Sequence, residues 1–250
     1  MVYKLLQLNI YKGFLLEKVI EFINKNRFDI VCLQEVSGGI ATFGQKDCYK
    51  KLVEKLNMGS DLSVTWRYKN EPDSYFGNAI FYKRALKVKN KKIIWLKDYQ
   101  EVEFGKENWA KVPRSALSLD FKLEGKIVTV VTTHLTRGPS SVDKPYKTKQ
   151  ANILLGYLKT LKNPFILTGD FNLNPQTQTV NSFSQLAQNL IATHKITNTL
   201  NPRTHRIKEL FPKGVAVDYI FVSEGIRVVD FGLANADLSD HLGLSLTFEV

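Results

Sequence analysis

The fold of this chain is decided by the stretch Phe165-Ile166-Leu167-Thr168-Gly169-Asp170-Phe171-Asn172. Its short apolar run, bounded by turn residues, predicts a β-strand that is buried on both faces. The preceding residues 148–161 predict a helix, because apolar residues recur on one face until Asn163-Pro164 ends the pattern. A helix that leads into a buried strand indicates α/β layers.

The rest of the chain repeats this mixture of strands and amphipathic helices. Further helices are predicted at residues 14–27, 47–56 and 177–191. Strands are predicted at residues 2–8, 30–33, 63–68, 76–82, 117–121, 127–133, 216–222, 226–231 and 244–248. Because no repeat, low-complexity stretch or Gly/Ser/Pro linker interrupts the pattern, we expect a single domain spanning residues 1–250.

Composition narrows the class of protein further. The 250 residues include 35 Lys and Arg against 24 Asp and Glu, a formal net charge of +11, which favours polyanionic partners. Two cysteines exclude a disulfide framework, and no apolar run approaches the roughly 20 residues that cross a bilayer. The first apolar segment is interrupted by Lys4, Gln7 and Asn9, unlike a signal peptide. We therefore expect a soluble, cytoplasmic monomer without a transmembrane segment.

Polar side chains stand just past the ends of several predicted strands. Asn9, Glu35, His134 and Asp170 each follow an apolar run. Ligands of α/β sheets bind at the C-terminal ends of strands, so these four residues converge on one rim if their strands are neighbours.

Each polar motif also has a structural interpretation. Asp170 and Asn172 offer a proton acceptor beside an amide, but Asp and Asn are equally common in loop turns. Glu35 is an anionic ligand or a surface residue at the start of a loop. Asp218 lies in an apolar strand, where a buried carboxylate needs a partner such as a histidine, or a backbone donor. Asp240-His241 is a metal ligand beside a general base, or an ordinary loop pair.

In combination, these elements closely resemble the endonuclease/exonuclease/phosphatase superfamily, over residues 3–249. In chain order they are Asn9, Glu35, Gly77-Asn78-Ala79, His134, Asp170-x-Asn172, Asp218 and Asp240-His241. The superfamily includes pancreatic-type deoxyribonucleases, apurinic endonucleases, neutral sphingomyelinases and inositol polyphosphate 5-phosphatases. The resemblance implies an α/β fold, a four-layered sandwich of two mixed β-sheets with helices on the outer faces.

The resemblance also implies a site and a reaction. It implies hydrolysis of phosphodiester bonds with a divalent metal, usually Mg²⁺ (Mn²⁺ is possible), beside Glu35, Asn9 and Asp240. His241 would activate water or steady the phosphoryl oxygens, with Asp218 as its carboxylate partner. Asp170 and Asn172 would handle a proton and hold the pentacovalent geometry. His134 and Arg114 would face the phosphate. Asn78 would shape the site.

Departures from the family pattern leave the substrate open. Tyr11 stands where members often have Asp, and residues 172–175 lack the arginine of inositol phosphatases. Six basic residues between 83 and 92, and a second group at Lys144, Lys147 and Lys149, favour nucleic acid as the substrate. Lysines that protect an exposed edge strand are the structural alternative for the first group.

Two other classes of function remain beside a nuclease. One is a phospholipid or small-molecule phosphoesterase, sphingomyelinase-like or phosphatase-like. The other is an inactive binding module, which the intact set of polar residues disfavours. Trp66, Trp95 and Trp109 could stack on bases or insert at a membrane, although core packing is their ordinary role.

Overall fold

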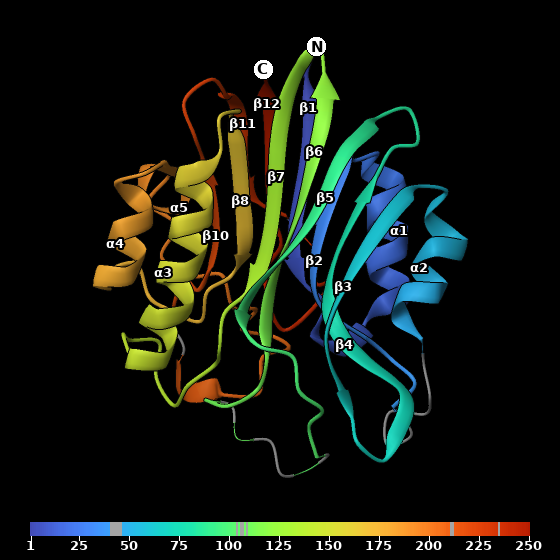
Figure 1. Ribbon diagram of the computed structural model, residues 1–250, viewed down its shortest axis with the longest axis vertical. Coiled ribbons are helices and arrows are strands. Elements are labelled where there is room, and N and C mark those ends of the chain that lie inside the picture. Colours follow the sequence, from blue (N-terminus) through green and yellow to red (C-terminus); the bar gives the residue numbers. More distant parts are fainter. Residues whose placement is uncertain (41–46, 104, 106–107, 109, 211–212, 235) are drawn as a thin grey trace.

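The computed structural model contains two six-stranded β-sheets packed face to face, with helices on the outer faces (Figure 1). It describes residues 1–40, 47–103, 105, 108, 110–210, 213–234 and 236–250. The four-layered sandwich predicted from the resemblance is confirmed. Trp109, one of the three tryptophans considered above, lies outside the described residues.

The first sheet combines both ends of the chain. Its strands are, in spatial order, β11 (Arg227–Leu233), β12 (Leu244–Glu249), β1 (Tyr3–Asn9), β2 (Ile30–Gly38), β4 (Glu71–Tyr82) and β3 (Gly59–Tyr68). Strands β1 and β2 run parallel, and the other neighbours are antiparallel. Asn9, the last residue of β1, pairs with Gln34 of β2, so it lies beside the residue that precedes Glu35.

The second sheet is built from the middle of the chain. Its strands are, in spatial order, β5 (Lys87–Lys97), β6 (Arg114–Leu123), β7 (Lys126–His134), β8 (Phe165–Asp170), β10 (Asp218–Val222) and β9 (Gln188–Asn189). Strands β7 and β8 are the parallel pair, and His134 lies opposite Asp170. Asp170 in turn lies opposite Asp218 of β10.

Helices cover the outer face of each sheet. On the first sheet, α1 (Leu16–Asn26) and α2 (Cys48–Leu56) bury one apolar stripe each against β1 and β2. The helices α3 (Pro145–Thr160), α4 (Gln178–Ser184) and α5 (Leu190–Thr193) lie beside the second sheet (Figure 1). Short 3-10 turns occupy Tyr11–Gly13 (η1) and Lys208–Leu210 (η3).

The layer between the sheets changes from apolar to polar along its strands. On β1, Leu5 packs in the inter-sheet core, whereas Gln7, two residues on, bonds across to Asp218 of the other sheet. On β2, Cys32 is in the same core, and Gln34 donates to Thr132 of β7. Because side chains two apart share a face of a strand, each inward face ends in a polar residue at the same end of the sandwich.

The structure corrects the sequence-based expectation for one segment and locates the lysine cluster in another. Residues 177–191 do not form one helix: Asn189 pairs with Phe221 on β10, and its side chain accepts a hydrogen bond from the Ala192 backbone, which starts α5. Residues 87–97 form the edge strand β5, so the edge-strand interpretation of the lysine cluster is correct in position.

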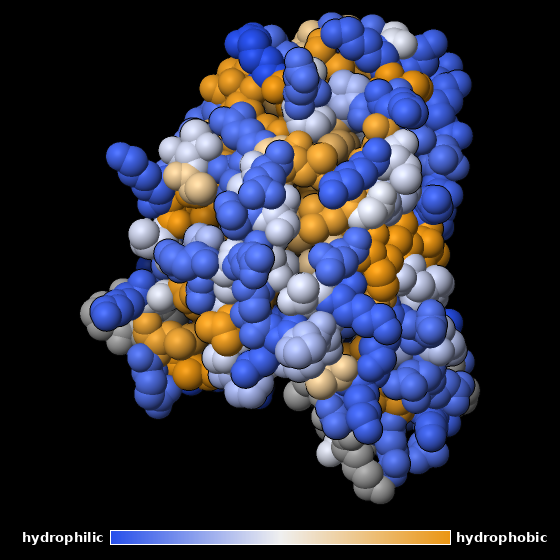
Figure 2. Space-filling model, turned by 60° about the vertical axis from the view of Figure 1, so that its left-hand side comes forward, coloured by the Kyte–Doolittle hydropathy of each residue, from blue (hydrophilic) through white to orange (hydrophobic). Residues whose placement is uncertain are grey.

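Among the described residues, no helix is long and apolar enough to cross a membrane. On the face shown in Figure 2, hydrophobic patches are surrounded by hydrophilic side chains. Cys32 and Cys48 are both buried and unbonded to each other.

Candidate active site

Five of the predicted site residues meet at the end of the sandwich where β1, β7 and β8 finish. Asp170 is their centre. Its Oδ2 accepts a hydrogen bond from Asn9 Nδ2 at 3.0 Å and lies 3.5 Å from His134 Nε2 and 3.8 Å from His241 Nε2. Asn9 Nδ2 is also 3.4 Å from Glu35 Oε1. Residues 9, 35, 134, 170 and 241 therefore share one site although they are spread along the chain.

The protonation of Asp170 responds to this environment. Burial raises the pKa of Asp170 to about 7, and the nearby charge of Asp218 also raises it, against the lowering effects of His241, the Asn172 amide and Asn9. A carboxyl group with a pKa near neutrality can accept or release a proton during a reaction at physiological pH.

Asp218 and His241 form a buried pair behind Asp170. Nδ1 of His241 lies 2.8 Å from Oδ2 of Asp218, within the 2.6–3.2 Å range expected for an oriented catalytic pair. This contact leaves Nε2 facing Asp170. Burial alone lowers the pKa of His241, but the charge and hydrogen bond of Asp218, with Asp170 and Asp240, raise it to about 10. The ring is therefore an imidazolium at neutral pH.

Two residues that were missing from the sequence-based site hold Asp218 in place. Thr199 Oγ1 donates to Asp218 Oδ2 at 2.7 Å, and Gln7 Nε2 lies 3.1 Å from Asp218 Oδ1. Gln7 could have been found, because it shares a strand face with Asn9 in an otherwise apolar run. No local signal marks Thr199, which lies in an irregular segment far from Asp218 in the chain.

Glu35 presents the best-placed free ligand atom for a metal. Its Oε2 is buried and has no hydrogen-bond partner among the described residues. Burial raises the pKa of Glu35, and Asp240 adds to the rise, against the lowering charges of Lys12 and His241 and the hydrogen bond from Asn9. Oxygen atoms of Glu35 and Asn9, with Asp240 close by, fit a hard divalent cation. Asn9 Oδ1 already accepts the Tyr11 amide at 3.0 Å, but a carbonyl oxygen has a second lone pair.

A second group of possible ligand atoms lies deeper. Atoms of Asp170, Asp218 and His241 fall within 4.8 Å of one another and could also hold a metal ion. However, Asp218 already accepts hydrogen bonds on both oxygens, and His241 uses Nδ1 toward it. Hydrogen bonding accounts for this trio without an ion, whereas the Glu35 oxygen is left unsatisfied.

Arg114 and Asn78 border the site on the side of β4 and β6. Arg114 is buried, its Nε has no hydrogen-bond partner among the described residues, and its guanidinium lies 5.2 Å from the ring centre of Trp66. Burial lowers the pKa of Arg114 to about 10, opposed by Glu35 and Asp170, so the group stays charged near those carboxylates. Asn78 Nδ2 donates to the Ser115 carbonyl at 3.0 Å and thereby fixes the strand next to Arg114.

His134 differs from His241 in charge. Burial lowers the pKa of His134 well below the ordinary value, and Arg114 lowers it further. Its Nδ1 is buried without a hydrogen-bond partner among the described residues. A neutral imidazole beside Asp170 can donate or accept one hydrogen bond but adds no charge.

Asn172 and a buried lysine shape the loop after β8. The Asn172 backbone amide donates to Asp170 Oδ1 at 2.9 Å, and its side-chain Nδ2 donates to the Leu135 carbonyl at 3.1 Å. Lys147, expected in a surface basic group, is instead fully buried and donates to the carbonyls of Ser140 and Asn172 at 3.0 and 2.8 Å. Burial lowers the pKa of Lys147 to about 8.

Backbone strain is concentrated at the same end of the sandwich. Eight described non-glycine residues have a positive φ, and four of them surround the site: Tyr11, Lys12, Glu35 and Asn172. Such conformations cost free energy and persist where the surrounding structure enforces them, often at functional sites. The strained backbone conformations therefore lie in the same part of the molecule as the hydrogen-bonded site residues.

Gly169 allows the two parallel strands to approach just before Asp170. It has φ +151°, and a Cβ there would lie 2.1 Å from the Thr133 carbonyl oxygen. Gly169→Ala should therefore lower the free energy of unfolding by about 1–3 kcal/mol and reduce turnover, because Asp170 must shift. Thermal unfolding and initial rates measure both effects.

Gly156→Ala in α3 is the matched control, since a Cβ there meets no atom within 4 Å. It should be neutral or stabilise the protein by up to about 1 kcal/mol. A Gly169→Ala protein with unchanged melting temperature and full activity would show that the close approach is unimportant.

Comparison with known proteins agrees with this geometry. A sequence model of the Endonuclease/Exonuclease/phosphatase family matches residues 6–241, and no curated protein matches. Among solved structures, an endonuclease/exonuclease/phosphatase from Bacteroides vulgatus has a TM-score of 0.76 at 20% identity, covering 100% of this chain and 99% of that one.

Two further structures carry more specific names. The mannosyl-6-phosphatase Bt3783 of Bacteroides thetaiotaomicron has a TM-score of 0.73 at 19% identity, covering 99% of this chain and 100% of that one. The human Nocturnin catalytic domain has a TM-score of 0.74 at 20% identity, covering 99% of this chain and 93% of that one. At these identities the likeness shows the fold, and not the substrate.

Proposed function

This chain belongs to the endonuclease/exonuclease/phosphatase family of phosphoester hydrolases, and we propose that it is a Mg²⁺- or Mn²⁺-dependent phosphodiesterase that acts on nucleic acid. The observation that carries the proposal is the position of Asp170 between two sets of groups. On one side is the His241–Asp218 pair, and on the other are Asn9 and the unsatisfied Glu35 oxygen. A proton acceptor, an oriented histidine and a metal-binding oxygen are the groups needed to activate water for attack on a phosphorus atom.

The proposed division of roles follows from charge. Glu35 and Asn9, with Asp240, would hold the divalent cation, which when bound supplies Lewis-acid stabilisation of charge on the phosphoryl oxygens. The imidazolium of His241 cannot accept a proton, so it donates a hydrogen bond from Nε2 to a phosphoryl oxygen. Asp170, with its pKa raised to about 7, accepts the proton of the attacking water.

The remaining residues orient and stabilise. Asp218 fixes the tautomer of His241 through Nδ1, and Thr199 and Gln7 fix Asp218. Arg114 supplies a permanent positive charge to the phosphoryl oxygens as negative charge develops. His134 faces the phosphate as a neutral donor, Asn172 supports the five-coordinate geometry, and Asn78 holds the wall of the site.

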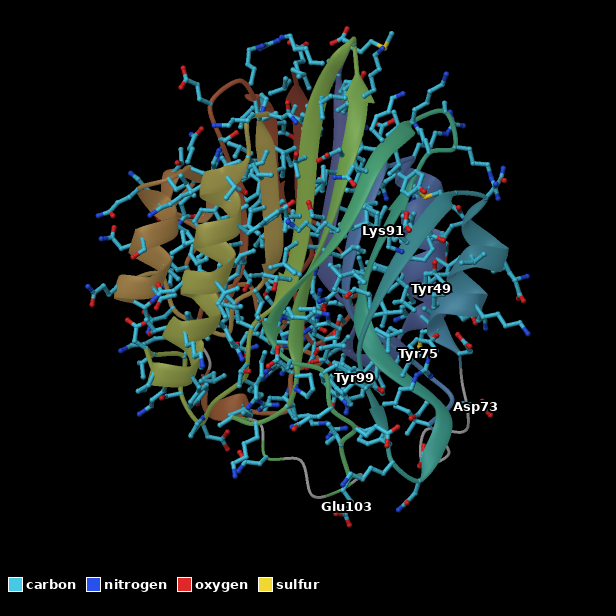
Figure 3. All side chains as sticks on the ribbon, viewed as in Figure 1. Tyr49, Asp73, Tyr75, Lys91, Tyr99 and Glu103 are labelled. Carbon is cyan, nitrogen blue, oxygen red and sulfur yellow. The ribbon has the colours of Figure 1, made fainter. Side chains whose placement is uncertain are left out.

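Positive charge at the rim supports a polyanionic substrate. Arg137, just after β7, is exposed, and its charge lowers the pKa of His134, though burial and Arg114 contribute more. The lysine cluster of β5, by contrast, lies away from the site. Strand β5 reaches the site at Lys97, which pairs with Arg114, and the cluster begins at the opposite end of the strand, where Lys87 pairs with Lys122. Lys91 of this cluster bonds to Asp61 at 2.8 Å and is labelled midway along β5 in Figure 3.

Salt dependence of nucleic-acid binding should therefore report on the rim. We expect Arg137→Ala to make the slope of log affinity against log salt shallower by about 0.7–0.9, the loss of one phosphate contact. Lys89→Ala on β5 is the matched control and should leave the slope unchanged. Fluorescence anisotropy with a labelled oligonucleotide measures both. An effect of Lys89 as large as that of Arg137 would place the substrate along β5 instead.

A phospholipid or small-molecule phosphoesterase is the second candidate. It is favoured by the structural likeness to a mannosyl-6-phosphatase, which is as strong as the likeness to Nocturnin. A panel of single- and double-stranded DNA, RNA, choline-phospholipid vesicles and mannose 6-phosphate, each with Mg²⁺, separates the candidates. We expect cleavage of nucleic acid, lost in His241→Ala. Turnover of only the lipid or the sugar phosphate would replace the nuclease by the second candidate.

A further inference from the structure

Two aromatic rings and a guanidinium cluster beside the site without any role in the proposed reaction. The ring centres of Tyr11 and Phe14 are 6.1 Å apart in an edge-to-face arrangement. The guanidinium carbon of Arg206 lies 5.2 Å from the centre of the Tyr11 ring. Tyr11 and Phe14 come from the turn after β1, and Arg206 comes from the irregular segment before β10.

Tyr11 is fixed to the centre of the site by its backbone. Its amide donates to Asn9 Oδ1 at 3.0 Å, and its backbone is held at φ 44°. Burial raises the pKa of the Tyr11 hydroxyl, with a lowering effect of Arg206 and raising effects of Asp240 and Glu35. The hydroxyl of Tyr11 therefore lies within electrostatic reach of Glu35, Asp240 and Arg206.

Packing does not account for this cluster. The side chain of Phe14 is 64% exposed, which makes it the most exposed aromatic side chain among the described residues. Arg206 is exposed and Tyr11 is half-buried. Phe14 packs edge to face on Tyr11, whose backbone amide bonds to Asn9 of the site, so this exposed aromatic surface is connected to the site through one residue.

We propose that Tyr11, Phe14 and Arg206 form a subsite that binds the base of the nucleotide adjoining the scissile phosphate. The inference rests on the proposed function and specifies its substrate. Bases stack on aromatic side chains and on arginine, largely independently of sequence. The ring of Phe14 offers the exposed aromatic surface, Tyr11 ties it to the catalytic centre, and Arg206 adds a cation for the stack or for the next phosphate.

The same cluster disfavours a choline headgroup. Quaternary ammonium ligands are held by the faces of aromatic rings, without competing cations. Here Arg206 already lies over the Tyr11 ring, and it would repel a second positive charge. The charge of Arg206 therefore favours a nucleotide over the choline headgroup of a sphingomyelin-like substrate.

Calorimetric titration of the whole protein with three small ligands tests the subsite. The probes are adenosine 5′-monophosphate, ribose 5-phosphate and phosphocholine, which share a phosphate and differ in the attached group. For the wild type we expect adenosine monophosphate to bind about tenfold more tightly than either other ligand. Phe14→Ala and Arg206→Ala should each reduce this preference severalfold, and the double variant should abolish it.

Matched controls lie on β11, at the other end of the sandwich. Val229→Ala removes an exposed apolar side chain, and Arg227→Ala removes an exposed arginine that pairs with Glu249. Both should keep the wild-type preference, and circular dichroism verifies that every variant is folded. Equal affinity of the wild type for adenosine monophosphate and ribose 5-phosphate, or a preference that survives the double variant, overturns the subsite.

The titration distinguishes this inference from the proposed function. Base preference that depends on Phe14 and Arg206, in a protein that cleaves no nucleic acid, leaves the subsite in place and refutes the nuclease. Cleavage of nucleic acid without any base preference refutes the subsite and leaves the nuclease standing.

Discussion

His241→Ala is expected to lower kcat for phosphodiester hydrolysis by a factor of about 10²–10³, the range for removing one hydrogen-bond donor to developing negative charge. The reason is the loss of the charged Nε2–H donor that the Asp218 contact of 2.8 Å holds in place. Steady-state rates on an oligonucleotide measure the effect. The control is His194→Ala, an exposed histidine whose ring contacts Phe231 and not the site, and it should retain full activity.

Asp218→Asn tests the same pair from the other side. It keeps the shape of the side chain but removes the charge that raises the pKa of His241. We expect kcat to fall while KM changes little, because Asp218 orients and does not touch substrate. A variant that works at the full rate would reduce Asp218 to a structural residue bonded to Thr199 and Gln7.

Asp170→Asn is expected to lower kcat by a similar factor of about 10²–10⁴. An amide at this position has one acceptor oxygen, so it keeps the hydrogen bond from the Asn172 backbone or the one from Asn9, and it cannot take a proton from water. Because the shape of the side chain and one of these hydrogen bonds are retained, the melting temperature should change far less than the rate.

Asp120→Asn provides the matched control for Asp170. Asp120 lies on β6 of the same sheet and accepts a hydrogen bond from Thr129 Oγ1 at 2.7 Å, away from the site. It should leave kcat unchanged. Substantial hydrolysis by Asp170→Asn would move the role of proton acceptor to another group.

Much of the site could be predicted because strand periodicity and strand ends are local features of a sequence. Asn9 and Asp170 each follow an apolar run, and the parallel pairing of β1 with β2 and of β7 with β8 brings those ends together. Asp218 was visible as a charge within an apolar strand. The family resemblance supplied the sheet order, which periodicity alone does not contain.

The remaining parts depend on tertiary contacts that no local pattern reveals. Lys147 resembles a surface lysine in the sequence, yet two carbonyls accept its hydrogen bonds in a fully buried position. Thr199 reaches Asp218 from an irregular segment. The charge of His241 also depends on three carboxylates from separate segments of the chain, so it follows only from the assembled site.

A magnesium titration of phosphodiester hydrolysis tests most directly whether this end of the sandwich is a metal-dependent hydrolytic site. The wild type should be inactive in excess EDTA and recover with added Mg²⁺ or Mn²⁺, whereas Glu35→Gln should need a higher metal concentration for half-maximal rate. Glu17→Gln, at an exposed position of α1, should titrate like the wild type. Full activity in excess EDTA, or an unchanged titration for Glu35→Gln, would contradict the account.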